Sequence, residues 1–265
     1  MTRKAILPMV ATAILAIALA SCGTKDETSN TPAGGPVGTA AGRPVDLATA
    51  GSIRGSVELD GNPPALRSVN MTAVANCAKQ HSSPAMTEDV VPGDGGTLQN
   101  VVVYLKGDFA EYSFALPQTA VEFDQKGCIF SPHVVALMIG QRLQARNSDP
   151  VTHNVNAVAR INKQRNETQS AGGAPTEQTF AQEEIAIPVK CNLHPWMRAY
   201  VAVLGSPYFQ VTGKSGSFEL TNVPPGTYTL TAWHETYGIS EQSITVGPKE
   251  EKTVTLTFKA AAGSG

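Results

Sequence analysis

One short stretch of the sequence gathers three side chains that bind metals. Cys191, His194 and Met197 fall within the run Cys-Asn-Leu-His-Pro-Trp-Met. This spacing puts a thiolate, an imidazole and a thioether on one tight loop between two expected strands. A further imidazole, that of His153 in the stretch Thr-His-Asn-Val, would complete a set of four donors. These residues together predict a metal centre.

The chemistry of the four donors favours copper over zinc. Cysteine and methionine sulfur atoms are soft ligands, and imidazole is intermediate. Two histidines and a cysteine in a trigonal set, with a weak axial methionine, form the ligand arrangement of blue-copper electron-transfer sites. Zinc takes a fourth histidine, cysteine or carboxylate in preference to a thioether. We therefore expect one type 1 copper, cycling between Cu(I) and Cu(II), at this loop.

The ligand segments resemble those of the cupredoxin family. The upstream match is an Asn-x-Asp…His-Asn pattern, formed by Asn147, Asp149, His153 and Asn154. The downstream match is Cys-x-x-His followed shortly by Met, in the short form that is similar to the amicyanin branch of the family. The resemblance covers residues 117–204, and it departs at Val189, where the family commonly has an aromatic residue.

The resemblance implies a role for each donor. His153 and Cys191 would be buried ligands, His194 would be the ligand nearer solvent, and Met197 would be the axial ligand. Asn154 would join the two ligand loops beside the metal, where neighbouring hydrogen bonds tune a metal centre.

Two further residues lie between the ligands His194 and Met197. Pro195 has no N–H group, so it cannot donate a hydrogen bond to the thiolate, and this should affect the redox potential. By the resemblance, Trp196 would lie near His194 and help to form an apolar docking surface for a redox protein partner.

Cys77 and Cys128 are a candidate disulfide. Closing the loop of about 50 residues between them would stabilise the fold by about 4 kcal/mol. The alternative is a second metal site that adds His81 and His133 to the two cysteines, and thiol counting would separate the two interpretations. His81, His133 and His234 could in principle form a type 2 copper site, but nothing in their spacing supports it. We expect His234 to be a structural hydrogen-bonding residue.

The N-terminus predicts export and lipidation. Arg3 and Lys4 precede an almost wholly apolar run, residues 5–20, which is shorter than the ~20 residues that span a bilayer. The run ends in Leu-Ala-Ser-Cys, which resembles a bacterial lipobox. The resemblance implies that residues 1–21 are a signal peptide and that Cys22 carries the lipid, the chain's only contact with a membrane. A plain signal peptide is the alternative.

The segment that follows is typical of a tether. Residues 22–50 contain no aromatic residue and are rich in Gly, Pro, Thr and Ala. We expect the protein in the cell envelope, lipid-anchored on the periplasmic side, which is an oxidising compartment. Gly23 favours the outer membrane if the source is Gram-negative.

The remainder of the chain predicts an all-β protein. Short alternating runs are separated by Gly and Pro turns, and no long helical period is present, although residues 71–81 predict one or two helical turns. Residues 162–177 are small and polar, and we expect a mobile surface loop there.

Two patterns outside the copper segment resemble the carboxypeptidase-regulatory-like domain, an immunoglobulin-like β-sandwich. They are Gly-x-Phe-x-Leu, ending at Leu220, and Pro-Pro-Gly-x-Tyr-x-Leu, ending at Leu230; the opening strand of that family is similar to Ile53–Val57. We expect one sandwich made of residues 51–116 and 205–260, with a Greek-key cupredoxin-like sandwich, residues 117–204, inserted in it. Two domains in series are the alternative.

Composition limits the remaining functions. The 265 residues carry a net charge of −2, so the chain has no basic surface for nucleic acid. No catalytic carboxylate pair, Gly-x-Ser-x-Gly or phosphate loop is present, so we do not expect an enzyme. The sequence predicts a monomeric lipoprotein that transfers single electrons between redox proteins. The alternatives are a periplasmic copper carrier or storage protein, and a structural or glycan-binding sandwich without redox activity.

Overall fold

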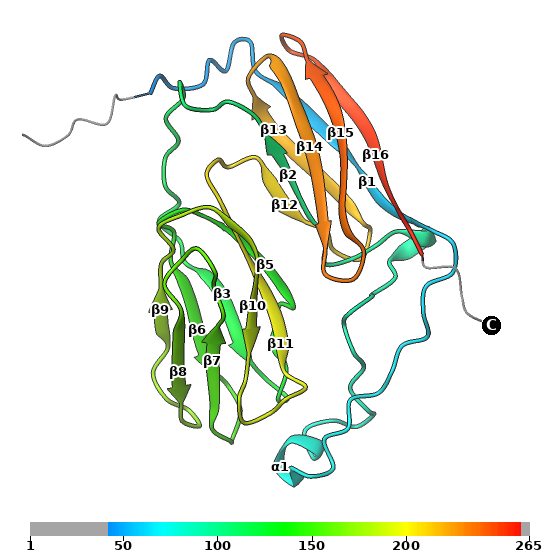
Figure 1. The fold of residues 1–265 in the computed structure, drawn as a ribbon, viewed down its shortest axis with the longest axis vertical. Coiled ribbons are helices and arrows are strands. Elements are labelled where there is room, and N and C mark those ends of the chain that lie inside the picture. Colours follow the sequence, from blue (N-terminus) through cyan, green and yellow to red (C-terminus); the bar gives the residue numbers. More distant parts are fainter. Residues whose placement is uncertain (1–41, 261–265) are drawn as a thin grey trace, which may run out of the picture. The chain divides into compact units, whose positions relative to one another are not determined.

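The computed structural model describes residues 42–260, and they are nearly all β (Figure 1). The helical elements are α1 (Ala75–Ala78) and the 3-10 turn η1 (Asp94–Gly96). The predicted all-β class is confirmed, and α1 falls in the stretch where the sequence predicts a helical turn. The predicted signal peptide, the predicted lipidation site Cys22 and most of the predicted tether lie outside the described residues.

One pair of sheets combines the beginning and the end of the described chain. The three-stranded sheet has the order β13-β1-β16, and the four-stranded sheet has the order β12-β2-β14-β15. The strands are β1 (Gly51–Asp60), β2 (Val102–Lys106), β12 (Phe209–Val211), β13 (Ser217–Val223), β14 (Gly226–His234), β15 (Gly238–Val246) and β16 (Glu251–Lys259). The alternating apolar positions of these strands form one buried core, which includes Ile53, Phe218, Leu230 and Leu256.

A second pair of sheets is built from the residues between β2 and β12. Its five-stranded sheet has the order β5-β11-β10-β7-β8, and its four-stranded sheet has the order β4-β3-β6-β9. The strands are β3 (Val121–Gln125), β4 (Phe130–Ser131), β5 (Val134–Met138), β6 (Leu143–Asn147), β7 (His153–Ala157), β8 (Arg165–Gln169), β9 (Thr176–Gln178), β10 (Glu184–Lys190) and β11 (Arg198–Leu204). Phe123, Phe130, Ile187 and Val201 are among the side chains fully buried between these sheets.

The prediction of a loop at residues 162–177 is wrong. This segment supplies β8 and β9, which are the edge strands of the two sheets. Edge strands gain backbone hydrogen bonds on one side, and all but one of the side chains of β8 and β9 are at least partly exposed, so a polar composition does not exclude them. Gln169 is the exception, because its side chain is buried. Its Oε1 accepts a hydrogen bond from Gln125 Nε2, and its Nε2 donates to Ala145 O.

The long connection from β1 to β2 packs against the second pair of sheets. It contains α1, and its residues Met71 and Cys77 are buried in the core of that pair. Its two arms run side by side, because the amide of Val69 donates to Ala85 O and that of Thr87 donates to Arg67 O, both at 2.8 Å. The connection therefore reaches the end of the sheets at which the candidate metal ligands lie.

Candidate metal centre

Three neighbouring strands bring the candidate ligands to one end of the five-stranded sheet. His153 is the first residue of β7, Cys191 directly follows β10, and Met197 directly precedes β11. Strand β10 pairs antiparallel with both β7 and β11. Lys190 at the end of β10 pairs with Asn156 of β7 and with Arg198 at the start of β11, so the residues that follow β10 continue toward His153, and a short loop returns the chain into β11.

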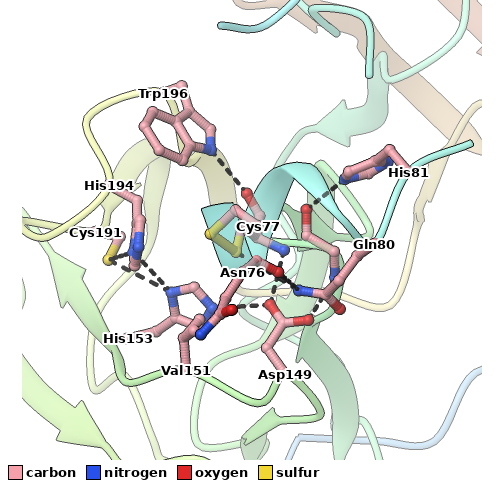
Figure 2. Close-up of a disulfide and its surroundings, with 12 residues drawn as sticks. Asn76, Cys77, Gln80, His81, Asp149, Val151, His153, Cys191, His194 and Trp196 are labelled. Atoms are coloured by element: carbon pink, nitrogen blue, oxygen red, sulfur yellow. Dashed lines mark hydrogen bonds and ion pairs between the residues drawn. A yellow bond between two sulfur atoms is a disulfide. The ribbon is translucent and has the colours of Figure 1, made fainter. Parts of the chain in front are cut away.

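Three donor atoms converge in a buried cluster (Figure 2). The Nδ1 atoms of His153 and His194 are 2.9 Å apart, and Cys191 Sγ lies 3.5 Å from His194 Nδ1 and 3.9 Å from His153 Nδ1. Bonds of about 2.0 Å to nitrogen and 2.3 Å to sulfur, about 90 to 120° apart, would separate donors by about 2.8 to 3.8 Å. The two imidazoles and the thiol therefore fit a single metal ion of this size.

Hydrogen bonds fix the loop that carries these donors. The amide of Met197 donates to His194 O at 2.9 Å, and the amide of Cys191 donates to Met197 O at 3.3 Å. The side chain of Met197 is buried in the same core. Exposed Pro195 completes the turn and offers no N–H group. The donors are thus held in position by the protein backbone.

Asn154 joins the two ligand loops, in the position that the sequence resemblance implies. Its side-chain Oδ1 accepts a 2.6 Å hydrogen bond from the backbone N–H of Asn192. Its backbone N–H donates to Cys191 Sγ at 3.5 Å. A second interloop bond runs from Asn156 Nδ2 to Asn192 Oδ1 at 3.0 Å. Donation from an amide to the sulfur stabilises the thiolate form.

Asp149 contacts a candidate ligand, a position that the sequence did not reveal beyond its place in the family pattern. Its carboxylate is fully buried and accepts hydrogen bonds from His153 Nε2 at 2.8 Å and from the amides of Gly127 and Cys128 at 2.6 and 2.7 Å. This bond leaves Nδ1 of His153 free to bind a metal, since a carboxylate only accepts. The four-residue spacing of Asp149 and His153 is the signal in the sequence that could have indicated it.

The same contacts perturb the ionisable groups. Burial alone would lower the pKa of His153, but its hydrogen bond to Asp149 and its contact with Cys191 raise it to about 9. Burial alone would raise the pKa of Cys191, yet its bonds with His153 and the amide of Asn154 lower it. The lowered pKa of Cys191 favours the thiolate, which is the form that binds metals, whereas a metal would have to displace a proton from the His153 imidazole.

His194 is the most exposed of the four candidate ligands, at 5% against 0% for His153, 2% for Cys191 and 1% for Met197. Its side chain is nevertheless buried, and Cys77 of α1 lies close to it. One ring nitrogen and the sulfurs of Cys77 and Cys128 lie within 4.8 Å of one another. Trp196 packs edge-on against the imidazole at 5.3 Å, and its Nε1 donates to Cys128 O at 3.0 Å, so the indole is held inward (Figure 2).

Cys77 and Cys128 form a disulfide, so they are not free thiolates for a second metal site. His81 Nε2 lies 2.7 Å from Gly127 O, and His133 pairs with Glu235. Among residues 42–260, no group of three donors within 4.8 Å includes His81, His133 or His234. His234 is buried, and its Nδ1 accepts hydrogen bonds from the next turn's backbone amides.

Comparison with known families matches the last part of the chain. The carboxypeptidase regulatory-like domain family matches residues 194–259, a region that contains β12 to β16. No curated protein matches the chain.

Among solved structures, an oxidised proline-to-alanine mutant of amicyanin is 20% identical over 32% of this chain and 82% of its own, with a TM-score of 0.29. A novel purple cupredoxin from Nitrosopumilus maritimus is 21% identical over 32% of this chain and 99% of its own, with a TM-score of 0.28. A Cu-containing nitrite reductase from Thermus scotoductus SA-01 is 18% identical over 35% of this chain, with a TM-score of 0.31. The match spans only 24% of that reductase.

The described residues contain no helix with the length and apolar character needed to cross a membrane.

Proposed function

We propose that this protein binds one copper ion through His153, Cys191, His194 and Met197, as a type 1 site, and carries single electrons between redox protein partners. The observation that carries the proposal is the convergence of two imidazole Nδ1 atoms and one cysteine sulfur in a buried cluster. Copper held by this donor set would supply a one-electron couple.

The residues around the donors suit electron transfer. Asp149 holds His153, and Asn154 holds the loop that follows Cys191, so the donors need to move little between oxidation states. The connection with α1 and Trp196 keep water away from His194. A rigid, dry ligand set of this kind favours transfer over ligand exchange and makes a copper carrier the weaker candidate.

We further propose a lipoprotein anchored through Cys22 on the periplasmic side of the cell envelope, acting as a monomer and not as an enzyme. The proposed domains are a cupredoxin-like domain, residues 117–204, inserted in a regulatory-like sandwich, residues 51–116 and 205–260, with the part of the β1–β2 connection around Met71 and Cys77 packed in the cupredoxin-like core. The sheet order supports this division, because β1 and β2 pair only with strands from the second of these two segments.

A spectrum of the copper-loaded protein tests the function. A type 1 site predicts an intense thiolate-to-Cu(II) absorption that bleaches reversibly on reduction, and Cys191→Ser should abolish it. Met138→Leu, which changes a buried methionine of β5, is the matched control and should keep the colour. Stoichiometric Cu(I) without colour in the oxidised state would instead indicate a carrier, and absence of bound copper would indicate a structural protein.

A further inference from the structure

A pocket of about 540 Å³ lies against the candidate ligand loop, beside Trp196 and Pro195. Its walls come from the ligand loop, from both arms of the connection that contains α1, and from Glu235 at the end of β14. Trp196, Met86 and Ile129 supply apolar surface. A pocket of this volume and mixed lining suits a molecule of one or two rings.

The polar side of the pocket is a chain of two carboxylates and an imidazole. The side chain of His133 is 6% exposed; its Nε2 pairs with Glu235, and its Nδ1 lies 3.8 Å from Glu88 Oε2. Glu88 is the accessible member, with a side chain that is 38% exposed against 11% for Glu235. Burial raises the pKa of the Glu88 carboxyl, which makes it a better proton acceptor.

Trp196 connects this pocket to the candidate metal centre. Its ring packs edge-on against His194 at a centroid distance of 5.3 Å, and the same side chain lines the pocket. Its hydrogen bond to Cys128 O fixes the indole in this position. His194 itself is buried. A small molecule in the pocket would therefore be separated from the candidate metal ligand His194 by the side chain of Trp196 alone.

The charges around the pocket favour a neutral ligand. Arg67 and Arg198 line it together with Glu88, Asp89 and Glu235. Arg67 is already paired with Asp89 at 2.9 Å. The lining therefore has no excess of positive charge to attract an anion, while its carboxylates accept hydrogen bonds from a ligand hydroxyl.

We infer that this pocket binds a small neutral phenol as an electron donor, an inference that rests on the proposed copper function. The phenol gives its hydroxyl proton to Glu88 and one electron through Trp196 and His194 to Cu(II). The products are a phenoxyl radical, protonated Glu88 and Cu(I), so the proton and the electron are both accounted for. His133 and Glu235 are positioning residues that hold Glu88 and the hydroxyl in place.

Binding to the metal-free protein tests the pocket without any copper chemistry. Titration calorimetry with 4-methoxyphenol should give a Kd of about 1 mM or lower. Met86→Trp, which fills the pocket from a partly exposed position, should raise this Kd at least about tenfold. Wild-type protein that does not bind 4-methoxyphenol, or a Met86→Trp variant that binds it equally well, would overturn the inference.

Reduction of the copper-loaded protein by two donors tests the proton acceptor. Hexaammineruthenium(II) gives an electron without a proton, whereas 4-methoxyphenol must lose both. Glu88→Gln should lower the ratio of the 4-methoxyphenol rate to the hexaammineruthenium(II) rate about a hundredfold. The matched control Glu58→Gln, an exposed position on β1, should leave the ratio unchanged. An unchanged ratio in Glu88→Gln would overturn the assignment of the proton acceptor.

The two proposals fail in different ways. A colourless copper-loaded protein refutes type 1 electron transfer, whatever the calorimetry shows. A blue protein that does not bind 4-methoxyphenol in its metal-free form keeps the electron-transfer proposal and refutes the phenol pocket.

Discussion

Replacing Cys77 and Cys128 together with alanine should remove about 4 kcal/mol from the free energy of unfolding. The two cysteines are 51 residues apart in the sequence, and both are fully buried. In the chain-entropy model, a cross-link of this length restricts the unfolded chain by about 4 kcal/mol at room temperature. The loss should arise mainly in the unfolded state, because the sheets themselves do not depend on the cross-link.

Urea unfolding of the metal-free protein measures this effect. The free energy in water is the quantity to compare, since an unfolded chain without the cross-link exposes more surface and should have a larger urea dependence. Wild-type protein reduced with a dithiol is the matched control, and it should lose the same free energy as the double variant. A loss below about 1 kcal/mol would refute the entropy argument.

The same variant should loosen the cover over His194. The disulfide ties α1 to the loop that holds Asp149 and Trp196. Without it, Cys191 of the metal-free protein should react faster with iodoacetamide, as measured by mass spectrometry of its peptide. An unchanged labelling rate, with the stability loss present, would show that packing of Met71 and its neighbours suffices to keep the cover closed.

Two further predictions follow from single carboxylates. Asp149→Asn should weaken copper binding about 10- to 100-fold, because the amide cannot accept from three donors at once; chelator competition measures this, and equal affinity would contradict the role. Glu184 accepts hydrogen bonds from the amides of residues 160–162, and although burial would raise its pKa, these bonds lower it. Its stabilisation should therefore be present above the ordinary carboxyl pKa and be lost as the pH falls through the lowered one. Glu184→Gln should lower the free energy of unfolding by about 2 kcal/mol at neutral pH. Urea unfolding at several acidic pH values should also show a weaker loss of this free energy with falling pH than in the wild type, and an unchanged pH dependence would contradict the assignment.

The strand pattern could be predicted well because it depends on local alternation. The short alternating runs separated by Gly and Pro turns form strands, as in β13 and β14. Edge strands β8 and β9 could not be predicted in this way, since a strand with little buried surface leaves no apolar signal. Their identity depends on partners β7 and β6, which lie elsewhere in the chain.

The candidate site divides along the same line. The ligand loop could be predicted from the sequence because Cys191, His194 and Met197 lie within a few residues of one another. Their soft donor atoms indicated the class of metal. The burial of His194 could not be predicted from the sequence, because Cys77, which lies close to it, is more than 100 residues away in the sequence. The Glu88 and His133 pocket likewise depends on four separate parts of the chain: the connection that contains α1, residues 129–133, the ligand loop and Glu235.

The sequence by itself determined the donor types and the all-β class, because both depend on residues close together in the chain. Only the tertiary structure decided which donors converge, that Asp149 orients His153, and that the His194 side chain is buried rather than exposed. The physical reason is that donor chemistry belongs to individual side chains, whereas burial and access depend on contacts between distant segments. In this protein the disulfide and the sheet register bring those segments together.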